Sequence, residues 1–124
     1  MYTVKSFLEQ YKERTHKLFD IVSKIINETD FSYLYSKETR LLSIGFNVDE
    51  NSLTDNFYDL LASEARQASL VAIAKKDIPS KHWNNLSRTL TKLGKYKGLI
   101  SWSGTAFEYL MPNINIKKYE RKFA

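Results

Sequence analysis

The 124-residue sequence contains no cysteine, which excludes a disulfide framework and any metal site built on thiolates. His16 and His82 are its only histidines, so a zinc site would need carboxylate ligands, and no spacing of acidic residues suggests one. Neither a phosphate-binding glycine loop nor a dinucleotide-binding glycine pattern occurs. We therefore expect no metal and no cofactor.

Long apolar runs are also missing. The first five residues lack the apolar stretch of a signal peptide. The longest stretch that is poor in charge, residues 98–116, is interrupted by Glu108 and contains Pro112, which is unlike a membrane span. The sequence therefore predicts a soluble segment.

The composition is that of a globular domain or part of one, with 43% hydrophobic and 27% charged residues. The net charge of +5 is unevenly spread. Residues 75–97 carry seven positive and one negative charge, whereas residues 28–66 carry three positive and eight negative charges. An anionic partner is one interpretation of this asymmetry, and a solvated basic loop, which we favour, is the other.

Two long helices are predicted from the apolar pattern. Apolar residues recur at three- and four-residue steps from about residue 3 to residue 27, so we treat residues 1–30 as a lead-in helix. A second helix is predicted to begin at Thr54 or Asp55 and to end near Lys75. It is apolar on almost every side, which predicts burial on almost every side.

Shorter elements surround the second helix. Residues 40–48 are expected to be extended with a bend at Gly45, and residues 99–102 to form a short strand. A short helix is predicted around His82, and another is capped by Thr105 and closed by Pro112. The charged tail, residues 117–122, is predicted to be frayed or helical. The predicted fold is mainly α, with short extended or hairpin segments.

Glu64 is the strongest candidate for chemistry. On the predicted second helix it lies inside the apolar stripe. A carboxylate there must be paired with a cation or held protonated, and a protonated carboxylic acid can act as a general acid. The alternative is a structural ion pair with Arg66, Arg40 or Arg88. The pattern favours neither.

Glu108 is the second candidate, because it is the only charged residue between Lys97 and Lys117 and has aromatic neighbours that include Trp102. Aromatic rings stack on sugar rings, and a carboxylate accepts hydrogen bonds from sugar hydroxyls. The alternative, about equally favoured, is a capping box in which Thr105 and Glu108 satisfy the first turn of their own helix.

Asp59 and Arg66 are seven residues apart and would share a face of the predicted helix. They are therefore expected to orient one another or to hold a substrate hydroxyl. Trp83 and Trp102 are candidate stacking platforms, although a buried tryptophan in a small domain usually belongs to the core.

Several runs resemble the central region of bacterial cyclic β-1,2-glucan synthases. They are FSYLY at residues 31–35, LSIGFN at 42–47, YDLLASEAR at 58–66, AIAK at 72–75, HW at 82–83 and SWSGTAFEYLMP at 101–112. The runs around Glu64 and Glu108 are long and unlike common helix sequence. Two positions depart from the family pattern: many members have a glycine where this chain has Lys76, and a methionine where it has Ala106.

The resemblance implies a fold and an activity. Residues 31–124 would be the N-terminal part of a glucoamylase-like helical domain, a partial (α/α) toroid, within a larger protein. That protein would transglycosylate, cyclise or hydrolyse β-1,2-glucan. It would be anchored in the bacterial inner membrane, with this segment on the cytoplasmic side.

The resemblance also assigns roles to individual residues. Glu64 would be the catalytic acid or base, and the residues around the glucan would be Tyr58, Asp59, Arg66, Trp102 and Glu108. A glycosidase-type mechanism ordinarily needs two carboxylates that flank the scissile bond, and in the family the second lies in a motif downstream of this segment. We therefore expect the isolated chain to be catalytically inactive.

The expected partners are β-1,2-glucan and the remainder of the parent polypeptide, with self-association possible through surfaces that lack their usual neighbours. Two alternatives remain open. One is a basic helical module whose lysines contact nucleic-acid phosphates, which we consider the less favoured reading. The other is a purely structural helical segment, in which Glu64 and Glu108 are internal ion-pair and capping residues.

Overall fold

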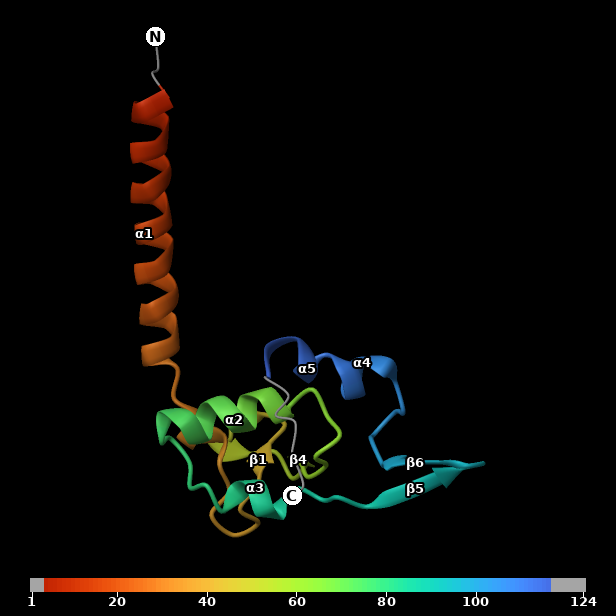
Figure 1. Cartoon of the computed structure of the whole chain (residues 1–124). Coiled ribbons are helices and arrows are strands. Elements are labelled where there is room, and N and C mark those ends of the chain that lie inside the picture. Colours follow the sequence, from red (N-terminus) through yellow and green to blue (C-terminus); the bar gives the residue numbers. More distant parts are fainter. Residues whose placement is uncertain (1–3, 117–124) are drawn as a thin grey trace, which may run out of the picture. The chain divides into compact units, whose positions relative to one another are not determined.

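A computed structural model describes residues 4–116, and the contacts within the chain divide it into two compact units, Met1–Asp30 and Phe31–Ala124. The first unit consists of helix α1, Val4–Glu28 (Figure 1). This confirms the first predicted helix, apart from Thr3, which lies outside the described residues. Considered by itself, α1 buries none of its residues, and its apolar side chains remain on its surface.

The second unit mixes short strands and short helices. Its elements in chain order are the 3₁₀ helix η1 (Phe31–Leu34), β1 (Leu42–Ser43), β2 (Phe46–Asn47), β3 (Ser52–Leu53), β4 (Phe57–Tyr58), α2 (Arg66–Lys75), α3 (His82–Asn85), β5 (Leu90–Leu93), β6 (Tyr96–Leu99), α4 (Ala106–Leu110) and α5 (Pro112–Asn115). The strands form three antiparallel pairs, β1 with β4, β2 with β3 and β5 with β6. The predicted tail at residues 117–122 lies outside the described residues.

The predicted fold class is wrong. Of the described residues, 46% are helical and 17% lie in short antiparallel strands, so the fold is a small mixed α/β fold and not a mainly α partial toroid. The largest local error is at residues 54–65, which were predicted to be helical. There β4 pairs with β1, matching Leu42 with Tyr58 and Ser43 with Phe57. Helix α2 begins only at Arg66.

Hydrogen bonds to the distant Ser87 and to the neighbouring Ser63 explain why the helix starts late. Asp59 accepts a backbone hydrogen bond from Ser87 at 2.6 Å, and Leu61 donates one to the Ser87 carbonyl at 3.0 Å. The Ser63 hydroxyl accepts from the Ala65 backbone at 3.2 Å. Serine, aspartate and asparagine side chains compete in this way with helical hydrogen bonds, which favours turns and helix starts over helix interiors.

The basic segment after α3 is a β-hairpin rather than part of a helical module. Leu93 pairs with Tyr96 across a two-residue turn, in which Gly94 has a φ of +60°. A positive φ at the first central residue alone is the pattern of a type II′ turn, which suits hairpins and favours glycine. Gly98 lies inside β6. The helical form of the nucleic-acid alternative is therefore wrong.

The core of the second unit lies between α2 and the β1–β4 pair (Figure 1). Leu42 of β1, Ala72 of α2 and Ile78 are buried together, and the partly buried side chains that pack against them are Phe31, Leu34, Tyr35, Tyr58 and Ile73. Of the residues of α2, only Ser69 and Ala72 are buried, so the predicted burial on almost every side is not found. The reason is that α2 has a packing partner on one face within this unit.

Buried polar groups tie the elements together. The Ser43 hydroxyl contacts the Gly45 carbonyl at 2.8 Å and the Thr54 hydroxyl at 2.8 Å, which holds β1 to the β2–β3 hairpin. His82 is completely buried. Its Nδ1 donates to the Arg40 carbonyl at 2.9 Å, and in the neutral ring this leaves Nε2 to accept from the Ser69 hydroxyl, also at 2.9 Å.

Helix α2 ends in a Schellman motif. Lys76 has a φ of 67° and a ψ of 20°, and its backbone N–H donates to Ile73 while that of Asp77 donates to Ala72. A left-handed conformation is unfavourable for residues other than glycine, and asparagine tolerates it better than lysine does.

We therefore expect Lys76→Gly to raise the free energy of unfolding by about 1 kcal/mol, because relief of the left-handed strain exceeds the entropy cost of glycine. Ala74→Gly, an exposed position inside the same helix, is the control and should lower the free energy of unfolding by about 1 kcal/mol. Urea unfolding of the two variants measures both changes. A loss of stability in Lys76→Gly would contradict the assigned cap.

Candidate functional site

The run that carries most of the predicted site residues connects β4 to α2. Tyr58 is in β4, Asp59 and Leu60 are held beside Ser87, and Glu64 lies in the turn that precedes Arg66, the first residue of α2. Tyr58, Asp59, Glu64 and Arg66 therefore span the stretch from the end of β4 to the start of α2. Asp59 and Arg66, which were predicted to share a helical face, do not do so, because α2 begins only at Arg66.

Glu64 is half-buried and has no ion pair among the described residues, which removes the predicted structural pairing with Arg40, Arg66 or Arg88. Its only side-chain hydrogen bond in the described chain is a long one, from the Ser63 hydroxyl at 3.4 Å. Arg88 instead donates to the carbonyls of Leu86 at 2.7 Å and Trp83 at 3.0 Å. The Glu64 carboxylate is consequently available for another group.

Asp59, Arg66 and Gln67 carry polar atoms that are buried and have no hydrogen-bond partner among the described residues. These atoms are Oδ1 of Asp59, Nε and Nη2 of Arg66 and Nε2 of Gln67. Desolvation by burial lowers the pKa of Arg66 from its ordinary value, although a guanidinium remains charged in proteins. Buried polar groups in native proteins are almost always paired, so each of these unpaired groups indicates a missing ligand, water or neighbour.

Gln67 was not identified from the sequence. A glutamine on a predicted helix gives no signal by itself, and its buried amide becomes notable only beside the other unpaired atoms. Tyr58, in contrast, packs against the Leu42 cluster, and this packing accounts for its position.

Glu108 is buried, with 6% of its surface exposed, and its carboxylate organises the loop before α4. It accepts hydrogen bonds from the hydroxyl of Ser101 at 3.0 Å, from the backbone and hydroxyl of Ser103, and from the backbone and hydroxyl of Thr105. The capping box predicted for Thr105 and Glu108 is confirmed. Trp102, on the same loop, is 60% exposed.

These hydrogen bonds set the ionisation of Glu108. Burial alone would raise the pKa of Glu108, but the hydrogen bonds from Thr105, Ser103 and Ser101 outweigh it and lower that pKa from 4.5 to about 2. Because the ionised form is the one that the fold stabilises, its contribution to stability is fully present above about pH 4.5 and is lost as the pH falls toward 2.

We therefore expect Glu108→Gln to unfold more readily than the unchanged chain at neutral pH, because an amide cannot accept all of the hydrogen bonds that the carboxylate accepts. The difference should shrink as the pH falls from 4.5 and should almost vanish near pH 2. Thermal unfolding across this pH range is the measurement. Glu38→Gln, at an exposed position, is the control and should show no such trend. A pH-independent effect of Glu108→Gln would contradict the assigned role of the charge.

Among the described residues, no helix is long and apolar enough to cross a membrane. Within residues 4–116, no group of three or more histidine, aspartate or glutamate side chains is placed to hold a metal ion.

Comparison with known proteins finds a relative of high sequence identity, although no protein-family model matches the chain. The chain is 49% identical over 105 residues to the cyclic beta-(1,2)-glucan synthase NdvB of Rhizobium meliloti (strain 1021). The match covers 85% of this chain but only 4% of the length of that relative. The resemblance seen in the sequence is thereby confirmed, and the chain is homologous to one segment of a cyclic β-(1,2)-glucan synthase.

Proposed function

We propose that this chain is the glucan-handling segment of a larger synthase that acts on β-1,2-glucan. The observation that carries this proposal is the set of unpaired buried polar atoms on Asp59, Arg66 and Gln67, which flank Glu64 in the sequence. The proposal that the ligand is a β-1,2-glucan follows from the name of the relative, a cyclic beta-(1,2)-glucan synthase. The unpaired atoms supply a physical reason for a ligand at this segment of the chain.

A glucan suits these atoms chemically. Each sugar hydroxyl both donates and accepts hydrogen bonds, so it can donate to Oδ1 of Asp59 and accept from the N–H groups of Arg66 and Gln67. Leaving a buried polar atom unpaired costs about 1–3 kcal/mol. Binding of a sugar would recover much of that cost, which makes the unpaired atoms a source of affinity for a polyhydroxylated ligand.

Glu64 is the proposed catalytic carboxylic acid. Protonated, it would donate its proton to a glycosidic oxygen, either directly or through a water molecule or sugar hydroxyl, as the bond to the anomeric carbon breaks. The sugar that leaves would depart as an alcohol. The carboxylate that remains would then take a proton from the hydroxyl group that attacks next, which completes a transglycosylation. The second carboxylate of the mechanism would come from outside this chain.

Trp102 and Glu108 are proposed to form a second contact region for the glucan. The exposed ring of Trp102 can stack on the apolar face of a glucose unit. Because the acceptor positions of Glu108 are used within residues 101–105, we assign it the role of positioning this loop, rather than that of binding a hydroxyl directly.

The proposed partner of the chain is the rest of the synthase polypeptide. Apolar side chains remain exposed on α2, as at Val71, and on α4, as at Phe107 and Leu110. Because the match spans 4% of the relative, other parts of a longer protein are available to cover these faces. We propose the cytoplasmic side of the inner membrane as the location and the central region of the synthase as the place of this segment.

The test is the synthesis of cyclic β-1,2-glucan by the longer synthase with Glu64 changed to glutamine. We expect product formation to fall by about three orders of magnitude while the protein remains folded, since a general acid contributes about 10²–10⁴ in rate. Full activity in a folded variant would sink the proposed role of Glu64.

A further inference from the structure

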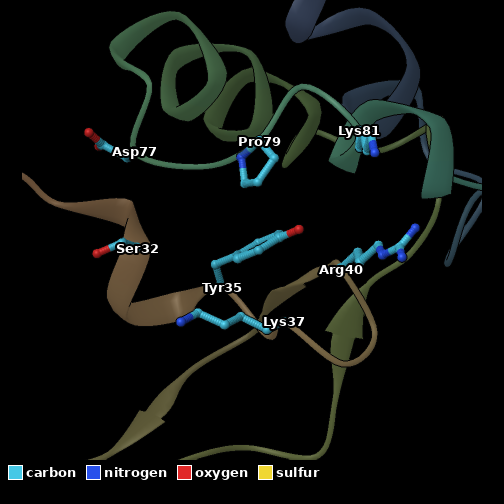
Figure 2. Close-up of a pocket in the computed structure, with 7 residues that line it drawn as sticks. All are labelled: Ser32, Tyr35, Lys37, Arg40, Asp77, Pro79 and Lys81. Atoms are coloured by element: carbon cyan, nitrogen blue, oxygen red, sulfur yellow. The ribbon is translucent and has the colours of Figure 1, made fainter.

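An open cavity of about 390 Å³ lies in the second unit, away from the residues assigned to the glucan. It is lined by Ser32, Tyr35, Lys37, Arg40, Asp77, Pro79 and Lys81 (Figure 2). These residues come from two separate parts of the sequence, the chain around η1 and the connection between α2 and α3. The volume is within the range of small-ligand sites, about 300–1,000 Å³.

The lining is strongly positive. Lys37, Arg40 and Lys81 are three cations around one cavity, and Asp77 is the only acidic residue that lines it. The Asp77 carboxylate is already engaged, because it contacts Nζ of Lys75 at 3.2 Å and accepts from the Phe31 backbone at 3.2 Å. The three cations therefore face the cavity without a carboxylate of the lining to neutralise them.

The position of Arg40 is fixed by the buried interior. Its φ of 58° is left-handed, which is uncommon for a residue other than glycine. Its carbonyl accepts from the completely buried His82 at 2.9 Å, and its own N–H donates to the Ser36 carbonyl at 2.8 Å. Strained backbone of this kind persists when the surrounding structure determines it, and it occurs often at binding sites.

Tyr35 lines the cavity between the cations. Its ring packs edge-on against His82, with 6.2 Å between the ring centres and an angle of 83° between the planes. Figure 2 shows the ring between Pro79 and Lys37, with its hydroxyl directed to the side of the cavity on which Arg40 and Lys81 lie. The cavity thus offers the hydroxyl group of Tyr35 as a donor, together with the ring surfaces of Tyr35 and Pro79, beside its three cations.

We propose that this cavity binds a phosphate group, either as inorganic phosphate or as a small phosphomonoester. A phosphate at neutral pH carries between one and two negative charges on oxygens that arginine can bind in pairs and lysine as a point charge. Arg40 and Lys81 hold these oxygens, the Tyr35 hydroxyl donates one further hydrogen bond, and Lys37 adds positive charge from the other side of the Tyr35 ring. The proposal does not depend on the glucan assignment, because no lining residue lies in residues 58–66 or 101–108.

The test is a titration of the ¹⁵N-labelled chain, followed by amide chemical shifts. The probes are inorganic phosphate and glucose 6-phosphate, with glucose as the neutral control. We expect saturable shifts at the backbone amides of Tyr35, Arg40 and Lys81, with a dissociation constant of about 1 mM or tighter, and no such shifts with glucose. Saturation by both probes assigns recognition to the phosphate group itself. Saturation by the ester alone adds a contact with the sugar.

Two matched double variants distinguish phosphate binding at this cavity from a general attraction of phosphate to the positively charged chain. Lys37→Gln/Lys81→Gln removes two cations from the cavity, whereas Lys92→Gln/Lys97→Gln removes two from the β5–β6 hairpin. The first pair should weaken phosphate binding by about tenfold or more and the second by less than about twofold. Circular dichroism verifies that both variants fold. Equal weakening in the two variants, or shifts that do not saturate, would overturn the proposal.

Discussion

Arg66→Met is expected to leave the isolated chain at least as stable as the unchanged chain while it lowers glucan synthesis by the longer synthase about a hundredfold. Nε and Nη2 of Arg66 are buried without a hydrogen-bond partner among the described residues, so the guanidinium lowers the stability of the unliganded chain. Removing one such unpaired group is expected to be neutral or to raise the free energy of unfolding by about 1 kcal/mol. Methionine retains the apolar part of the side chain.

The loss of activity has a separate cause. If the Arg66 guanidinium holds sugar hydroxyls, a substrate bound to the Arg66→Met variant would lose charge-assisted hydrogen bonds worth about 1.5–3 kcal/mol, which corresponds to a reduction of about ten- to two-hundredfold in rate or affinity. Stability and activity should therefore change in opposite directions, as at sites that are built for a ligand.

Arg88→Met is the matched control, since it removes a guanidinium that already has two carbonyl partners, Leu86 and Trp83. It is expected to lower the free energy of unfolding by about 1 kcal/mol and to leave activity largely intact. Urea unfolding of the chain and a glucan assay on the synthase are the two measurements. A destabilised Arg66→Met chain would mean that Arg66 is structural and would remove the main physical support for the ligand site.

The elements that were correctly predicted are those determined by neighbouring residues. The periodic pattern before Glu28 was enough to predict α1, and the Thr105–Glu108 spacing was enough to predict the capping box. In both, the interacting groups are three or four residues apart. The short helix at His82 was also predicted, since Pro79 and Ser80 mark its start.

The errors arose where distant residues compete with local pattern. The apolar run before α2 has a helical period, but Tyr58 pairs with Leu42 of β1, and Asp59 and Leu61 are held by Ser87. Neither partner can be identified from the run itself. The β5–β6 hairpin did carry a local signal, a glycine at the first position of a two-residue turn, but the high lysine content drew the interpretation toward a basic loop.

The grouping of Asp59 and Arg66 in the candidate site rested on a reason that the structure does not support. Asp59 and Arg66 were grouped because seven residues span two helical turns, yet Asp59 precedes the helix altogether. What makes them notable is the burial of polar atoms without partners, which no sequence pattern reports. The cavity around Arg40 was not predicted, because residues near 35–40 and 77–81 meet only in the folded chain.

The central claim is that Glu64 performs chemistry on β-1,2-glucan in a larger synthase. Its placement supports the claim, because the carboxylate is half-buried, lies in the turn before α2 and has no ion pair among the described residues. Glutamine has nearly the same shape as glutamate but cannot donate a carboxylic proton or take one up. Glu64→Gln therefore removes the proposed chemistry with little change in packing.

The measurement is the rate of cyclic β-1,2-glucan formation by the longer synthase with Glu64→Gln, compared with Glu38→Gln as a control at an exposed position. Far-ultraviolet circular dichroism and glucan binding are recorded on the same preparations. We predict a rate reduced about a thousandfold for Glu64→Gln, with folding and binding retained, and an unchanged rate for Glu38→Gln. A folded Glu64→Gln synthase that forms cyclic glucan within about twofold of the normal rate would contradict the account, because it would make Glu64 a structural residue.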